Sequence, residues 1–269
     1  MEATESSNGV KYECLLFDMD DTLYPLSSGL NLDCRKNIIE YMSKHLDIEE
    51  SEVPRMCLEL YREYGTTMAG LKVLGHEFDN DEFHAYVHGR LPYEKLKPDP
   101  VLRNLLLSMP QRKIIFTNAD HAHAVRVLNR LDLEDCFEGI ICFETLNPPE
   151  QVDHFEALDD ITDSGCFSSK RQILCKPSVE AMEAATRITN VDPSKTIFFD
   201  DSARNIASGK AAGLRTVIVG SSVLVPGADH ALSSIHNIKE ALPEIWEVQE
   251  GEQLEQVIQS SAVETVVLA

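Results

Sequence analysis

Three carboxylates stand within four residues, directly after a short apolar segment near the start of the chain. The segment is Cys14-Leu15-Leu16-Phe17, and Asp18, Asp20 and Asp21 follow it. A short apolar run that ends in a polar turn is typical of a buried strand. Carboxylates this close raise one another's pKa unless a cation joins them, and oxygen ligands suit a hard ion such as Mg²⁺. The pattern predicts that one of Asp18 and Asp20 serves as a nucleophile and the other as a proton donor, with a metal ion between them.

Five further residues that could take part in this chemistry stand at or near the ends of later elements. They are Thr117, Asn118, Lys176, Asp200 and Asp201. In open parallel sheets, ligands bind outside the carboxyl ends of the strands, which meet at one edge. Residues far apart in the sequence are therefore expected to converge on one site.

The elements that must position these residues alternate along the chain. Apolar runs predict strands at 14–17, 113–117, 139–143, 196–200 and 215–219, and helical spacing predicts helices at 122–130, 178–189, 203–212 and 238–246. This alternation predicts an α/β fold with a doubly wound, Rossmann-like parallel sheet that has helices on both faces. Residues from about 30 to 88 show helical spacing without a strand, which predicts a small all-helical insert after the first strand.

The predicted domain organisation follows from these patterns. The α/β core is expected at 11–24 and 96–235, the helical insert at 25–95, and a C-terminal helix with an acidic tail at 236–269. Residues 144–172 are polar and irregular, and they are expected to form a surface loop.

Composition limits the partners and the setting. The chain has 269 residues and a formal net charge of −21, which argues against binding nucleic-acid polymers or anionic membranes. A small anionic substrate fits if a metal and basic groups reverse the local field. The seven cysteines show no zinc-binding spacing, and neither a signal peptide nor a membrane-spanning run is evident. We expect a soluble, reduced, cytoplasmic protein, for which a monomer is compatible with the sequence.

The ordered motifs resemble those of the haloacid dehalogenase (HAD) superfamily of phosphatases. They are Asp18-Met19-Asp20-Asp21-Thr22, which matches the family's DxDxT pattern, then Thr117, Lys176 and Phe198-Phe199-Asp200-Asp201-Ser202. The helical insert resembles the family's C1-type cap. The resemblance implies that Asp18 attacks phosphorus to form an aspartyl-phosphate, and that Asp20 serves as general acid and then base.

The same resemblance implies the remaining roles. Mg²⁺ would be held by the Asp18 side chain, the Asp20 backbone carbonyl and Asp201. Many members have a glycine where this chain has Asp200. Because this chain has two adjacent acids there, Asp200 is the alternative to Asp201 as the residue that contacts the metal. Thr117 and the Asn118 N–H would bind phosphoryl oxygens, and Lys176 would offset the negative charge.

Substrate choice is expected to depend on the insert and on the segment after Thr22. Residues 24–29 and 61–71 resemble the pyrimidine 5′-nucleotidase branch of the family. On that resemblance, Tyr24 or Tyr64 would stack on a base, and Thr66 or Thr67 would bond its edge. The alternative is that both tyrosines only pack within the insert.

The predicted function is a Mg²⁺-dependent phosphomonoesterase that acts on a small phosphorylated metabolite, with UMP or CMP as candidates. One alternative is a 2-haloacid dehalogenase, which would need neither Asp20 nor the Asp200–Asp201 pair. Another is a non-catalytic interaction or phosphate-sensing module. Locally, Thr22 could be a capping residue, one of Asp200 and Asp201 could cap the following helix, and Lys176 could be a solvated residue. His121 and His123 are interpreted as the start of a helix rather than as metal ligands.

Overall fold

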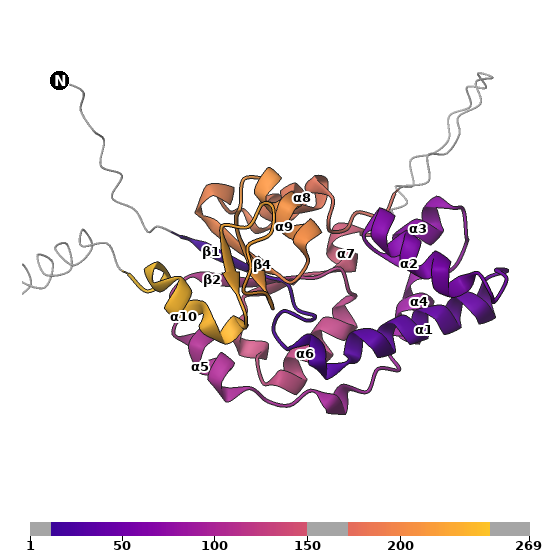
Figure 1. Ribbon diagram of the computed structural model, residues 1–269, viewed down its shortest axis with the longest axis horizontal. Coiled ribbons are helices and arrows are strands. Elements are labelled where there is room, and N and C mark those ends of the chain that lie inside the picture. The colour runs from indigo at the N-terminus through magenta and orange to yellow at the C-terminus, as the bar shows by residue number, and fades with distance from the viewer. Residues whose placement is uncertain (1–11, 150–171, 248–269) are drawn as a thin grey trace, which may run out of the picture.

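The computed structural model describes residues 12–149 and 172–247 of the chain. At its centre is a six-stranded sheet in the order β3-β2-β1-β4-β5-β6, in which every neighbouring pair is parallel (Figure 1). The strands are β1 (Cys14–Phe17), β2 (Arg112–Phe116), β3 (Gly139–Ile141), β4 (Thr196–Asp200), β5 (Arg215–Val219) and β6 (His230–Leu232). The predicted doubly wound α/β fold is confirmed.

Side chains along each strand point alternately to the two faces of the sheet. Because apolar side chains stand on both faces, helices cover both of them. The flanking helices are α5 (Pro100–Leu107), α6 (His121–Leu131), α7 (Phe143–Leu146), α8 (Val179–Thr189), α9 (Ala203–Ala211) and α10 (Ile238–Ala241). Leu15 and Phe17 pack into one buried cluster with α5, α6 and α10, whereas Cys14 and Leu16 pack into another with α8 and α9. The central strand β1 is therefore buried on both faces, which fixes the position of the loop that follows it.

A third buried cluster holds the helical insert together. Its helices are α1 (Leu30–His45), α2 (Val53–Tyr64), α3 (Thr67–Val73) and α4 (Asn80–Val87). Tyr41, Leu60 and Phe83 are buried among them, and Phe143 of α7 joins this cluster from the core. The insert is all-helical, as predicted, and Figure 1 shows it beside the sheet-containing part. The exact domain boundaries stay predictions.

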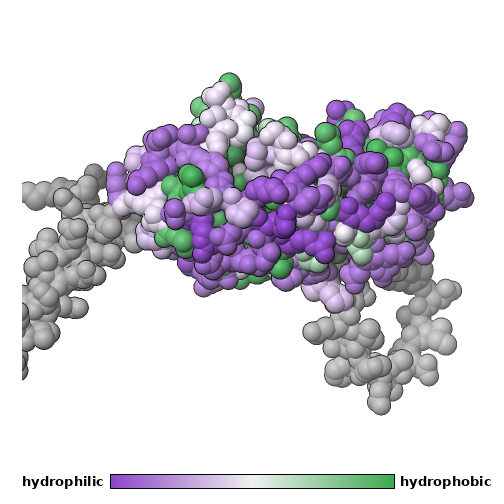
Figure 2. Space-filling model, turned by 90° about the horizontal axis from the view of Figure 1, so that it is seen from below, coloured by the Kyte–Doolittle hydropathy of each residue, from purple (hydrophilic) through white to green (hydrophobic). Residues whose placement is uncertain are grey.

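One face of the molecule shows mainly polar residues. The face seen in Figure 2 is mostly hydrophilic, with hydrophobic residues in small separate patches. None of the helices in the described ranges is both long enough and apolar enough to traverse a bilayer. The cytoplasmic location stays a prediction.

Three local predictions differ from the structure. The third strand ends at Ile141, because Cys142 and Thr145 form a reciprocal capping box that starts α7 at Phe143. The helix predicted at 238–246 is short, since Pro243 cannot continue it and instead begins a 3₁₀ turn. The edge strand β6 has only three residues and was not predicted. Most of the predicted loop at 144–172 and nearly all of the acidic tail lie outside the described residues.

Candidate active site

A buried lysine joins two carboxylates at the carboxyl end of the sheet. Lys176 Nζ lies 2.7 Å from Asp18 Oδ1 and 2.8 Å from Asp200 Oδ2, and it also donates to the Phe116 carbonyl at 2.7 Å. The Lys176 side chain is only 1% exposed. The second oxygen of Asp18 accepts a hydrogen bond from the Thr22 hydroxyl at 2.9 Å. Both Asp18 oxygens are thus held in fixed directions.

The local structure explains how these residues meet. β1 pairs with β2 on one side and with β4 on the other, so the ends of these three strands lie side by side. The Asp18 N–H continues the β1–β4 ladder by donating to the Phe199 carbonyl at 2.8 Å. Lys176 arrives from the loop before α8. The convergence of sequence-distant residues on one edge, expected from the alternating pattern, is found for Asp18, Lys176 and Asp200.

Electrostatics in this cluster reflect burial and mutual charge. Burial alone would lower the pKa of Lys176, but Asp18 and Asp200 outweigh it and raise that pKa above its ordinary value. Burial raises the pKa of Asp18, and the Lys176 ammonium works against the rise. The lysine is therefore a fixed positive charge beside the candidate nucleophile.

Asp200 and Asp201 are placed very differently, although they are neighbours. Asp200 is fully buried, and its oxygens accept from Lys176, from the Ser202 N–H at 2.8 Å and from Asn205 Nδ2 at 2.9 Å. Asp201 is more open to solvent, and its carboxylate forms no ion pair within the described ranges. Burial and the neighbouring Asp200 raise the pKa of Asp201 to about 7. Of these two neighbours, Asp200 is the carboxylate held by Lys176 and Asn205, and Asp201 is the one exposed toward solvent.

The carboxylate cluster suits a hard divalent cation. Oxygens of Asp18, Asp200 and Asp201 lie within 4.8 Å of one another. One oxygen of Asp21 is also buried without a hydrogen-bond partner. Carboxylates that share a site and raise one another's pKa are stabilised by a cation, and an all-oxygen set fits Mg²⁺. The residues present therefore fit the metal that the sequence pattern predicts.

Asp20 belongs to a separate hydrogen-bond network. Its Oδ1 accepts from the Tyr24 hydroxyl and lies 2.8 Å from His123 Nε2. His123 Nδ1 in turn lies 2.7 Å from the Tyr93 hydroxyl. Burial would raise the pKa of Asp20, but His123 and the hydrogen bond from Tyr24 lower it to about 2. Burial lowers the pKa of His123, yet Asp20 outweighs burial and raises it.

Thr117 and Asn118 follow strand β2 and make different contacts. The Thr117 hydroxyl oxygen accepts from the Ala119 N–H at 3.1 Å. The Asn118 side chain binds the Lys176 backbone in both directions, accepting from its N–H at 2.8 Å and donating to its carbonyl at 2.9 Å. The Asn118 amide thereby fixes the loop that carries the buried lysine, a contact that could not be predicted from the sequence.

A cavity of about 420 Å³ opens between the core and the insert. Its lining includes Asp20, Asp21, Tyr24, Leu26, Leu30, Asn31, Cys34, Arg35, Ile38, Cys57, Leu58, Tyr61, Thr67, His88, Leu91, His123 and Asp201. The volume lies in the range of small-molecule sites. Tyr64 and Thr66 are not in this lining: Tyr64 borders another cavity beside Lys72, and Thr66 accepts from the Ala69 N–H as the N-cap of α3.

The insert meets the core close to Lys176. Gly65 has a φ of +88°, and a Cβ at this position would stand 2.3 Å from the Lys176 carbonyl oxygen. Only glycine suits both the backbone conformation and the close approach. Arg204 Nη1, near the start of α9, donates to the carbonyls of Tyr61 and Arg62 at 3.2 and 2.6 Å. These contacts hold the end of α2 over the site.

The contacts of His123 and Tyr93, like those of Asn118, were not evident from the sequence. His123 was recognised only as a residue near the predicted edge of the sheet, at the start of a helix. That helix, α6, does begin at His121, and this places His123 in its first turn, where the ring reaches Asp20. Tyr93 lies in a 3₁₀ turn outside every motif. A histidine in the first turn after a predicted active-site strand was the available signal.

Known proteins share this sequence pattern and this fold. The family described as haloacid dehalogenase-like hydrolase matches residues 12–213. Phosphate metabolism protein 8 of Saccharomyces cerevisiae is 26% identical over 211 residues, which are 75% of this chain, and the chain spans about 60% of that relative's length.

Solved structures resemble the chain over most of its length. A HAD phosphatase from Thermococcus onnurineus has a TM-score of 0.52 and 16% identity over 85% of this chain and 96% of its own. A Thermotoga maritima protein assigned as a β-phosphoglucomutase has a TM-score of 0.50 and 23% identity over 86% of this chain and 99% of its own. At these identities the resemblance supports a shared fold alone.

Proposed function

Because the chain belongs to the haloacid dehalogenase-like hydrolase family, we propose that this hydrolase is a Mg²⁺-dependent phosphomonoesterase acting through an aspartyl-phosphate at Asp18. The observation that carries the proposal is the pairing of a carboxylate cluster, Asp18 with Asp201, and a second acid, Asp20, in its own hydrogen-bond network. Halide displacement by Asp18 would need neither a metal ion held by Asp201 nor the second acid, Asp20. Phosphoryl transfer uses both.

The first step would be attack of Asp18 on phosphorus. Lys176 and Thr22 hold the two Asp18 oxygens, so the carboxylate is oriented before substrate arrives. Bound to the carboxylates of Asp18 and Asp201 and the Asp20 backbone carbonyl, Mg²⁺ would neutralise charge on the phosphoryl oxygens. The Thr117 hydroxyl and the Asn118 N–H are proposed to donate to those oxygens, while Asp200 keeps Lys176 in place.

Asp20 would transfer the protons of both half-reactions. As the P–O bond to the leaving group breaks, the leaving oxygen takes a proton from Asp20; Asp20 then accepts a proton from the water that attacks phosphorus. The contacts with His123 and Tyr24 hold the pKa of Asp20 at about 2, and the shared hydrogen bond correspondingly raises the pKa of His123. We propose that the Asp20–His123 pair stores this proton, with the anionic substrate raising the pKa of Asp20.

The cavity supports a small metabolite as the source of the phosphoryl group. Its insert side carries Tyr61, Thr67 and Arg35. Tyr61 suits an aromatic base, Thr67 suits the hydrogen-bonding edge of a base, and Arg35 suits a negative or polar sugar group. We propose that Tyr24 and Tyr61 contact the leaving group, with pyrimidine 5′-nucleotides such as UMP or CMP as candidate substrates. Tyr64 and Thr66 would act indirectly by positioning the turn between α2 and α3.

A release assay over a panel of compounds tests the reaction class. The purified chain would be incubated with nucleotide, sugar and aryl phosphates, with Mg²⁺ or with a chelator, and with 2-chloropropionate in parallel. We expect phosphate release only with Mg²⁺ and no chloride release. Acid trapping with a radiolabelled phosphate substrate should give a phosphorylated chain. Chloride release that persists in chelator would replace the proposal with the dehalogenase alternative.

A further inference from the structure

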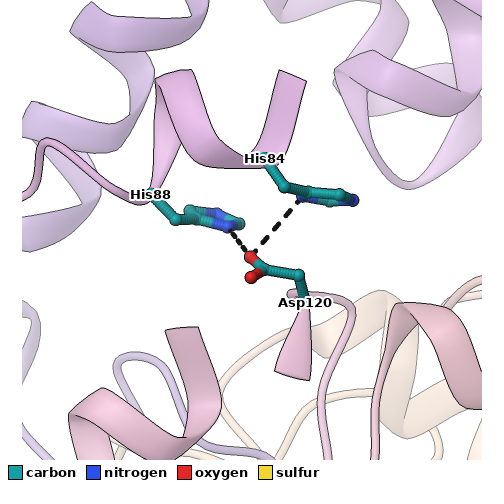
Figure 3. Close-up of side chains that lie close together, drawn as sticks. All are labelled: His84, His88 and Asp120. Atoms are coloured by element: carbon teal, nitrogen blue, oxygen red, sulfur yellow. Dashed lines mark hydrogen bonds and ion pairs between the residues drawn. The ribbon is translucent and has the colours of Figure 1, made fainter. Parts of the chain in front are cut away.

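A second cluster of metal-binding residue types lies where the insert meets the core. His84 is in α4 and His88 caps its C-terminal end, so the two rings lie one turn apart on the same side. Asp120 precedes α6 in the core and points at both rings (Figure 3). His88 Nδ1 contacts Asp120 Oδ1, and His84 Nδ1 lies 3.6 Å from the same oxygen. One ligand atom from each residue falls within 4.8 Å of the others.

The His84 ring is the unexplained part of this arrangement. Its side chain is 8% exposed, and neither ring nitrogen has a hydrogen-bond partner among the described residues. A polar group buried without a partner costs free energy, and such a group calls for an explanation in the structure. His84 faces Asp120 rather than solvent, and Phe143 covers it with a ring-centroid distance of 4.7 Å. A bound cation would supply the missing partner.

The chemistry of the three residues selects the class of metal. Two imidazoles and one carboxylate are ligands of zinc and similar ions, whereas Mg²⁺ prefers oxygen alone. Ligand atoms about 2 Å from a tetrahedral ion stand roughly 3–4 Å apart, which small shifts of these side chains would reach. Burial and the neighbouring His88 also lower the pKa of His84 to about 4, and the neutral imidazole is the form that binds metals.

A supporting contact fixes the third ligand. Asp120 Oδ2 accepts a hydrogen bond from the His123 N–H at 3.2 Å, which leaves Oδ1 directed at the two histidines. Outer contacts of this kind orient metal ligands and raise affinity. The cluster is also distinct from the carboxylate site, since none of its three residues belongs to the group formed by Asp18, Asp200 and Asp201.

We propose that His84, His88 and Asp120 form a binding site for a transition metal of the Zn²⁺ class that bridges the helical insert and the core. Two ligands come from the insert and one from the core, so the ion cross-links the two parts. The bound ion therefore favours the arrangement in which the insert covers the cavity, because separation would break metal–ligand bonds. This site and its effect do not depend on which reaction the carboxylate site catalyses.

Spectroscopic titration of the full chain tests the binding. Metal-free protein would be titrated with Co²⁺, which absorbs visible light when bound in place of Zn²⁺, in excess Mg²⁺ to saturate the carboxylate site. We expect one Co²⁺ per chain with the spectrum of a nitrogen- and oxygen-ligated site, displaced by Zn²⁺. His84→Gln, His88→Gln and Asp120→Asn should each weaken binding by about tenfold or more.

The matched control is His121→Gln, an exposed histidine next to Asp120 that is not part of the cluster, and it should bind like the wild type. Asp120→Asn keeps helix capping, since asparagine also caps well. It therefore tests the site even if a histidine variant misfolds, which circular dichroism without metal will reveal. Equal Co²⁺ binding by the wild type and Asp120→Asn would overturn the proposal. So would a thiolate-to-Co²⁺ charge-transfer band, which indicates cysteine ligands, or a loss of Co²⁺ binding in His121→Gln as large as that in the three cluster variants.

Hydrogen exchange tests the cross-link. With Zn²⁺, amide exchange in α4 and in the first turn of α6 should slow together, and the Tm of the wild type should rise. Neither change should occur in Asp120→Asn. Slower exchange in α4 alone would show that the ion does not bridge to the core and would overturn the proposed cross-link.

Discussion

The two walls of the active site, which are the carboxyl end of the sheet on the core side and the insert side of the cavity, are built on different principles. On the core wall, charged groups are held by short, directional contacts: Lys176 alone joins Asp18, Asp200 and the Phe116 carbonyl. On the insert wall, the lining is largely hydrocarbon and aromatic, with Leu58 and Tyr61 among its members. Directional contacts fix one geometry for one reaction, whereas apolar surface accepts many shapes. The difference indicates that reaction class and substrate choice reside on opposite walls and respond to different changes.

The largest effect is expected on the core wall, from Asp18→Asn. The amide keeps the size of the side chain but cannot attack phosphorus, so turnover should fall by about a thousandfold or more. The measurement is kcat of the Mg²⁺-loaded variant with p-nitrophenyl phosphate. Its far-ultraviolet circular dichroism should match the wild type. Turnover within tenfold of the wild type would rule out Asp18 as the nucleophile.

Lys176→Met should show how much the core wall depends on its buried lysine. Removing the lysine leaves Asp18 and Asp200 buried without their shared partner, which typically costs about 3–5 kcal/mol of unfolding free energy. Lys195→Met is the matched control, because Lys195 pairs with Glu13 at the surface and should contribute at most about 1 kcal/mol. Urea unfolding measures both. Similar losses in the two variants would contradict the contrast between buried and exposed pairs.

The core wall could be predicted from the sequence because its signals are local and ordered. Asp18 and Asp200 stand at the ends of apolar runs, Lys176 stands just before a predicted helix, and parallel strands bring their carboxyl ends together whatever the details of packing. Asp18, Lys176 and Asp200 therefore meet as expected. The backbone clamp that Asn118 places on Lys176 was not predictable, since it depends on the path of a loop.

The insert wall was harder to predict because it depends on how helices rotate and pack. Tyr61 and Tyr64 are three residues apart on α2, yet only Tyr61 lines the cavity beside Asp20. Helical periodicity shows that the two are neighbours on one surface, but it does not say which of them turns toward another domain. The contact between His123 and Asp20 likewise depends on the tertiary position of α6.

Between the two walls, His123→Gln should change stability in a pH-dependent way. The folded pKa of His123 lies above the ordinary value of 6.5 because of Asp20. A raised folded pKa gives stability that is fully present below the unfolded pKa and is lost as pH rises through the folded pKa. The wild type should therefore exceed the variant by about 1.5–3 kcal/mol near pH 6, and by less near pH 9.

Urea unfolding at both pH values checks this expectation. His121→Gln serves as the control because that ring is exposed, and its effect should be small at either pH. A stability difference that grows with pH would mean that His123 is neutral in the folded protein. The Asp20–His123 pair could then not store the proton proposed for the reaction.

The smallest effect, and the one that decides the insert wall, is expected from Tyr61→Ala compared with Tyr64→Ala. Loss of a stacking ring that contacts a base should reduce kcat/KM for UMP about tenfold relative to p-nitrophenyl phosphate, because the aryl ester makes fewer contacts there. Tyr64 lies outside the lining, so its removal should lower the two values in parallel. Unchanged ratios in both variants would remove aromatic stacking by α2 as the basis of substrate choice. A selective loss in Tyr64→Ala alone would instead show that the turn after α2 rearranges on binding and brings that ring to the substrate.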